Sequence, residues 1–279
     1  MRQFNGSAQD KLNITQTVFG FVRKHQPLVK WLLLAVFFTV VATLAYRLNG
    51  EQKSSSNPRV ESVEVQSLYI AAMGLSLTLG WCAYEIFDRN QQRHKQRRVD
   101  AWDRLSVEAG KLPALEYLNS QGDSFQGLTL KDAQLENAQL EKADFCKANL
   151  SGSSLKNANL AHANLSDADL RDTDLTDADL TGSNLSGAKL NRAKLNGSNL
   201  EGANLSHAMM TNANALRSNL ERANLRNAEL DNVDFRHSNL RYADLNGANL
   251  EGSRFKRAEL TGAIMPDGSI YSSEHRLDG

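Results

Sequence analysis

The residues able to bind metals or move protons are scattered along this 279-residue chain. His162, His207 and His237 are candidate metal ligands or bases, because imidazole serves both purposes near neutral pH. Carboxylates concentrate in residues 167–179, where only Arg171 opposes them, and paired carboxylates can do acid/base work. The chain has no C-x-x-C, no H-E-x-x-H and no glycine-rich phosphate loop after a strand. We therefore expect no enzyme activity, no cofactor and no metal.

Basic side chains are the second group of candidate functional residues, because they could bind a partner. The formal net charge is +0, yet residues 1–122 carry 15 Lys/Arg against 10 Asp/Glu, and residues 123–279 carry 17 against 22. Clustered like charge costs self-repulsion, so a retained basic cluster favours a site for an acidic protein surface or anionic head groups. The alternative is drift at tolerant surface positions. The candidate partner-binding residues are Lys194, Arg217, Arg236, Arg254, Lys256 and Arg257.

A five-residue repeat positions these side chains. Over residues 135–265, every fifth residue is Leu, Phe or Met at 26 of 27 positions, and only Ala215 departs. The residue two before it is Ala, Ser, Thr or Val in all 27 units, and Asn or Asp lies between in 17 of 27. A period of five fits neither a helix nor a continuous strand, so each unit must be a short extended segment followed by a turn. The small residue and the Leu then point inward.

A single unit cannot bury its own Leu, so the units must stack as a solenoid. The repeat alone leaves open how many units make one coil. Typical units are Ala143-Asp144-Phe145, Ala148-Asn149-Leu150 and Ala158-Asn159-Leu160. They resemble the units of the pentapeptide-repeat family. The resemblance implies a β-solenoid over residues 123–265: a right-handed, four-sided β-helix with one pentapeptide on each side and 20 residues per coil.

Residues 20 apart stack in such a coil, which separates the surface into columns. The three histidines fall on different sides and cannot converge on one metal. Asn and Asp fill the columns through Asn184 and Asn199 almost without a break, which indicates a structural role for those two sides. The other two sides are interrupted by Lys189, Met209, Glu229, Lys194 and Arg254. In the inner column, we expect the large Phe235 to fill the space left by Ala215.

The N-terminal region contains two apolar runs. Residues 28–48 and 68–87 are each long enough to cross a ~30 Å hydrocarbon core as a helix, which predicts a transmembrane hairpin with a polar loop at 49–67. A cleaved signal peptide is the alternative for the first run. Lys and Arg follow the second run and precede the first, so both termini are expected in the cytosol, with residues 1–27 as a cytosolic arm. The expected location is a bacterial inner membrane or a cyanobacterial plasma or thylakoid membrane.

Residues 88–122 are predicted to form a basic juxtamembrane helix and an N-terminal cap for the β-helix, with a second short helix starting at Pro113. Residues 266–279 are expected to be a terminating turn and tail, because Pro266 cannot continue a β ladder. The basic segment is also a candidate contact for anionic lipid head groups. Its residues are Arg89, Arg93, Lys95, Arg97 and Arg98.

These features favour a non-enzymatic, membrane-anchored scaffold or protein-interaction module that presents a β-helix at the cytosolic membrane face to an unknown protein partner. One alternative, implied by the resemblance, is a DNA-mimicking inhibitor of a nucleic-acid enzyme. That role needs a strongly acidic repeat region, whereas residues 123–279 have a net charge of only about −5 (17 against 22), so no nucleic-acid target is expected. An accessory subunit of a membrane transporter is a further alternative.

Overall fold

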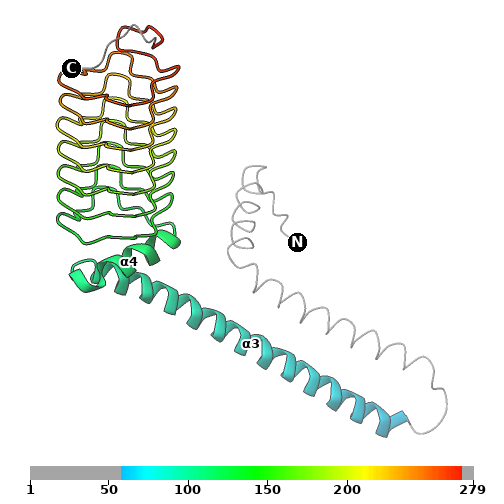
Figure 1. Ribbon diagram of the computed structural model, residues 1–279. Helices are drawn as coiled ribbons and strands as arrows, with labels where there is room; N and C mark the ends of the chain where they lie inside the picture. The colour runs from blue at the N-terminus through cyan, green and yellow to red at the C-terminus, as the bar shows by residue number, and fades with distance from the viewer. Residues whose placement is uncertain (1–57, 272–279) are drawn as a thin grey trace, which may run out of the picture. The chain divides into compact units, whose positions relative to one another are not determined.

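The computed structural model describes residues 58–271 (Figure 1). Helix α3 spans Pro58–Arg104 and helix α4 spans Glu108–Ser120, and the repeats follow. The chain divides into two compact units, Met1–Gln96 and Arg97–Gly279. The predicted arm at 1–27, the first predicted span at 28–48 and the tail at 272–279 lie outside the described residues.

Helix α3 starts earlier than the sequence pattern indicated. We predicted a polar loop over 49–67, but the helix begins at Pro58, so the second half of that loop prediction is wrong. Proline suits the first position of a helix because its fixed φ is close to helical and its missing N–H would have no intrahelical partner there. From Pro58 the helix continues through residues 68–87 and the basic segment to Arg104.

The part of the chain described by the structure contains no helix that is both long and apolar enough to cross a membrane. The predicted second span at 68–87 is therefore not supported.

Helix α4 covers the N-terminal end of the repeat region (Figure 1). Its Leu115 and Leu118 are fully buried in the same core as the repeat leucines. The prediction that Pro113 starts this helix is wrong, because α4 begins at Glu108 and Pro113 lies inside it. An interior proline costs about 3 kcal/mol, which the burial of two leucines at about 1.5–3 kcal/mol each offsets. Tertiary packing thus overrides the local signal.

The repeats form a coil of 20 residues with four sides. Every fifth residue from Thr129 to Asp244 makes a parallel β-bridge with the residue 20 positions later, as Asp144 does with Asn164. Successive coils are joined on each side by backbone hydrogen bonds of 2.7–3.1 Å. The predicted β-solenoid and its 20-residue coil are confirmed.

Each unit ends in a turn whose third residue has a positive φ. The N–H of Ala133 donates to the carbonyl of Leu130 at 3.2 Å, and Asp132 between them has φ 56°. A positive φ confined to the third residue is the pattern of a type II turn, which favours Gly and Asn. At Gly197 a Cβ would lie 2.2 Å from Oδ1 of Asp177 in the coil before, so any other residue there would require the Asp177 side chain to turn away.

The inward columns form one apolar core. All the Leu, Phe and Met positions from 135 to 265 are buried except Leu250, which is half-buried. Ala215 is fully buried with Phe235 next in its column, and Phe235 stacks on Phe255 with ring centroids 5.2 Å apart. At the other end, Phe145 stacks in the same way on Phe125 at 5.0 Å.

The last coil ends in a reversal of the chain. Ile264 pairs with Ile270 in an antiparallel bridge, and the N–H of Met265 donates to the carbonyl of Ser269 at 2.7 Å. Pro266 has no N–H to offer to a parallel ladder, which explains why regular stacking ends there.

Candidate interaction surface

Two sides of the coil carry asparagine ladders. Nδ2 of Asn184 donates to Oδ1 of Asn164 at 3.3 Å, and Asn204 donates to Asn184 at 3.1 Å. Oδ1 of Asn204 also accepts the backbone N–H of Ser206 at 3.2 Å, the Asx turn that explains why Asn and Asp are preferred. These contacts give the two sides a structural role. The second ladder joins Asn199, Asn219 and Asn239.

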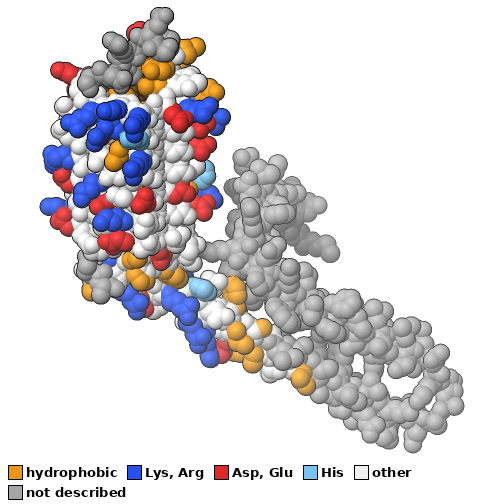
Figure 2. Space-filling view, in the orientation of Figure 1, with side chains coloured by type: hydrophobic (Ala, Val, Ile, Leu, Met, Phe, Trp, Pro, Cys, Tyr) orange, Lys and Arg blue, Asp and Glu red, His pale blue; other side chains and the backbone are white. Residues whose placement is uncertain are grey.

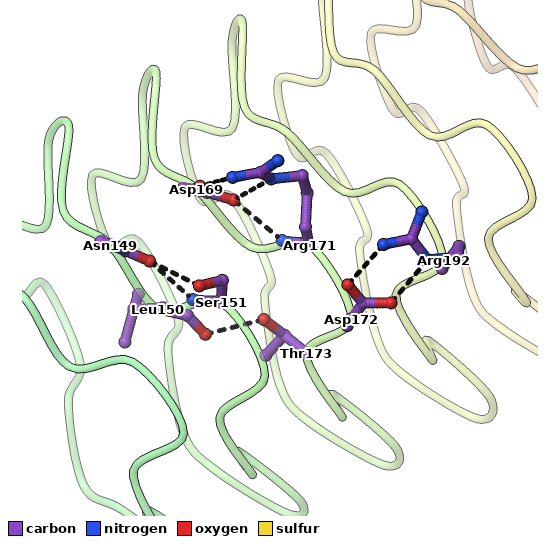
Figure 3. Close-up of polar contacts among 8 residues, drawn as sticks. All are labelled: Asn149, Leu150, Ser151, Asp169, Arg171, Asp172, Thr173 and Arg192. Carbon is purple, nitrogen blue, oxygen red and sulfur yellow. Dashed lines mark hydrogen bonds and ion pairs between the residues drawn. The ribbon is translucent and has the colours of Figure 1, made fainter.

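Half of the carboxylates in the acidic run at 167–179 are paired with cations, and Figure 3 shows two of them, Asp169 and Asp172. Asp169 accepts hydrogen bonds from Nε and Nη2 of Arg171 at 2.8 and 2.5 Å. Asp172 accepts both of its bonds from Arg192, each at 2.6 Å. These guanidinium hydrogen bonds keep the pKa of Asp169 and the pKa of Asp172 below their usual values. The expectation that only Arg171 opposes this run is wrong, because Arg192 reaches it from the next coil.

Asp174 in the same run lies between two lysines. Nζ of Lys156 is 3.4 Å and Nζ of Lys194 is 3.5 Å from Oδ2 of Asp174. Burial acts to raise the pKa of Asp174, but the hydroxyl and N–H of Thr176, together with the two lysines, outweigh it and lower that pKa. Lys194, one of the candidate partner-binding residues, is thus already close to a carboxylate.

The three histidines lie apart, each at the end of a turn: His162, His207 and His237 all have a positive φ. A Cβ on Gly182 would lie 2.7 Å from Nδ1 of His162, so that ring packs on the next coil. Within residues 58–271, no group of three or more His, Cys, Asp or Glu side chains is placed to bind a metal.

The remaining candidate residues gather on the last three coils, where Figure 2 shows Lys and Arg side chains toward the C-terminal end of one face. The guanidinium of Arg236 binds Asp234 in a bidentate ion pair, with Nε donating to Oδ1 at 2.8 Å and Nη2 donating to Oδ2 at 2.7 Å. This hydrogen-bonded pair lowers the pKa of Asp234, to which the charge of Arg254 in the next coil contributes less. Arg236 is therefore a weaker candidate for binding than the sequence indicated.

Four exposed cations remain on this face. Arg217, Arg254, Lys256 and Arg257 form no ion pair with any residue that the structure describes. Backbone bonds stack their turns, since the N–H of Arg217 donates to the carbonyl of Arg236, and that of His237 to the carbonyl of Lys256, both at 3.1 Å. Strands so stacked are ~4.8 Å apart, which fixes these charges close together. We call Arg217, Arg254, Lys256 and Arg257 the basic surface.

A feature missed in the sequence lies on the neighbouring corner. The Tyr242 ring is 51% exposed, and the guanidinium carbon of Arg222 is 5.8 Å from its centroid, within cation–π range. The 20-residue spacing between the two was the signal that could have revealed the pair.

In the basic segment of α3, two of the five candidate lipid contacts have partners. Arg89 pairs with Glu85 at 2.8 Å, and Nε of Arg98 donates to Asp123 at 3.1 Å. Arg93, Lys95 and Arg97 are exposed.

Family models match this repeat architecture. The model described as a pentapeptide repeat region covers residues 128–205, and the one described as pentapeptide repeats (8 copies) covers 188–227 and 228–265. The chain belongs to the pentapeptide-repeat family. A search of the curated proteins gives no match.

HetL and QnrB1 are among the solved structures that are similar to this chain. HetL of the cyanobacterium Nostoc, a pentapeptide repeat protein involved in heterocyst differentiation regulation, is 31% identical; the match covers 53% of this chain and 78% of HetL, with a TM-score of 0.33. QnrB1, a plasmid-mediated fluoroquinolone resistance protein, is 22% identical over 50% of this chain and 73% of its own, with a TM-score of 0.48.

Proposed function

We propose that this chain is a non-enzymatic protein-interaction module whose basic surface docks an acidic partner protein. The observation that carries this proposal is the set of exposed cations without ion pairs, Arg217, Arg254, Lys256 and Arg257, fixed on stacked coils. Like charges held close together raise the local potential and attract a complementary surface. The rigid coils reduce the ordering cost of binding.

The acidic run weighs against DNA mimicry, since half of its carboxylates, Asp169, Asp172 and Asp174, already bind Arg or Lys of this chain. A DNA mimic needs carboxylates that are free to replace phosphates. We therefore propose no nucleic-acid enzyme as the target.

A charge-reversal variant tests the docking proposal. Full-length chain with Arg217→Glu and Arg257→Glu should lose the acidic proteins that wild-type chain co-purifies from its native membrane extract. Lys147→Glu is the matched control, because Lys147 also has a positive φ, is exposed and lies near the other end of the repeats. If the double variant retains every wild-type partner at physiological salt, the basic surface is only solvated.

We also propose that residues 28–48 anchor the chain in a membrane as a single span. The support is the apolar run in the sequence and the Lys/Arg distribution around it. Such an anchor would place the β-helix beside membrane-bound partners. Deletion of residues 28–48 should release the chain into the carbonate-soluble fraction, and retention in the pellet would contradict the proposal.

A further inference from the structure

A cavity of about 410 Å³ lies between the last two turns of α3 and helix α4. Its volume is within the ~300–1,000 Å³ typical of small-ligand sites. All its lining residues belong to the unit Arg97–Gly279. The lining residues are Arg97, Asp100, Ala101 and Arg104 from α3, and Pro113, Ala114 and Tyr117 from α4.

The spacing of the α3 residues explains why they meet at one place. Positions three, four and seven residues apart share one face of a helix, so Arg97 and Arg104 line the same face one above the other. On α4, Pro113 and Tyr117 are four apart and face them. Two guanidinium groups therefore border a single cavity.

Two cations without ion pairs border this cavity. Arg97 and Arg104 form no ion pair within the described ranges. Asp100, the one carboxylate in the lining, already has an interaction of its own. Two guanidinium groups on one helix face therefore favour a ligand rich in acceptors. The hydroxyl of Tyr117 is buried and has no hydrogen-bond partner among the described residues, so it is out of reach of a ligand in the cavity.

Neighbouring Arg98 is not part of this site. Its guanidinium binds Asp123, and that hydrogen bond is the main reason that the pKa of Arg98 is raised.

We propose that this cavity binds the phosphate group of an anionic ligand through Arg97 and Arg104. Guanidinium groups match phosphate oxygens with paired, charge-assisted hydrogen bonds. The phosphate comes either from a phospholipid head group or from a soluble phosphate ester.

Equilibrium dialysis of full-length protein in detergent against radiolabelled inorganic phosphate tests the site. We expect saturable binding by wild-type protein, weakened about tenfold by Arg97→Gln or Arg104→Gln alone and about a hundredfold by the two together, since each lost charge-assisted bond is worth roughly a factor of ten. Arg93→Gln with Lys95→Gln is the control, because both residues are exposed on α3 outside the cavity, and it should bind like wild type.

Competitors separate the two sources. Monomeric dihexanoylphosphatidylglycerol should displace the label more strongly than glycerol 3-phosphate if the ligand is a lipid, and less strongly if it is a soluble ester. Each single arginine variant changes one exposed side chain, so its fold should be intact by circular dichroism even if the double variant is unstable. No phosphate binding by wild type, or equal binding by wild type and both single arginine variants, would overturn the proposal.

Discussion

The carboxylate of Glu116 accepts the backbone N–H of Gln139 at 2.8 Å, so a side chain from α4 ends the sheet on that side of the first coil. One coil later the equivalent N–H belongs to Asn159, which donates to the carbonyl of Ala138 at 2.9 Å. The carboxylate of Glu116 therefore takes the place of the backbone carbonyl that a preceding coil would offer to the N–H of Gln139. An edge covered in this way cannot pair with another chain.

Replacing Glu116 should loosen this cap. Glu116→Ala leaves the exposed N–H of Gln139 to water, and we expect a loss of about 1–2 kcal/mol in unfolding free energy from one charge-assisted hydrogen bond. Urea unfolding of the full chain, followed by circular dichroism, measures it. Glu136→Ala is the control, since Glu136 is a glutamate of the first coil outside the cap. Equal midpoints for the two variants would mean that the Glu116 contact adds no stability.

The asparagine ladder allows a graded test at Asn204. Asn204→Ala removes the bonds to Asn184, Asn224 and the N–H of Ser206, and should lower the unfolding free energy by about 1–3 kcal/mol. Asn204→Asp keeps both acceptor roles and loses only the donor, so its cost should be smaller. Met209→Ala on the next side is the control outside the ladder. If Asn204→Asp costs as much as Asn204→Ala, the Asx turn contributes nothing.

Acid should weaken the Asp234–Arg236 pair in a definite pH window. The Arg236 hydrogen bonds lower the pKa of Asp234 in the folded chain, so its stabilising effect is present above the unfolded pKa of about 3.9 and is lost as pH falls through the folded pKa. At neutral pH, Asp234→Asn should cost about 0.5–1 kcal/mol, since the pair is partly exposed.

The measurement is the difference in unfolding free energy between wild type and Asp234→Asn, followed from pH 7 to pH 2. It should be constant above about pH 5 and shrink below about pH 4. Arg236→Gln removes the cause of the lowered pKa and should reduce the same pH-dependent difference. A difference that grows toward acid would contradict this assignment.

The core was predictable because its signal is local. Each inward residue, such as Leu180, is identified by a five-residue period, and every unit repeats the same extended segment and turn. The 20-residue coil came only from the family resemblance, because a pentapeptide does not specify how many corners close a coil. Once that number is known, the contact of Arg192 with Asp172 follows from their separation of 20 residues.

The helical region was less predictable because its boundaries depend on packing. Pro113 is a local start signal, yet burial of Leu115 and Leu118 beside the repeats keeps it inside α4. The Tyr117 cavity and the cap contact of Glu116 depend on how α4 lies on the first coil, which no short sequence window contains. The pairing of surface charges was equally difficult to predict from the sequence. Arg236 was predicted to be available to a partner, but in the structure its guanidinium donates two hydrogen bonds to Asp234.

The membrane proposal leads to a labelling test of topology. In a Cys82→Ser background, Ser55→Cys and Cys146 both follow residues 28–48, so a single span places them on the same side of the membrane. Cys146 is partly exposed in the repeats, and a membrane-impermeant maleimide added to intact cells should therefore label both cysteines or neither. Labelling of both only after lysis would place the β-helix in the cytosol, and labelling of both before lysis would place it outside. Labelling of only one of the two before lysis would require a crossing between them and would contradict the single span.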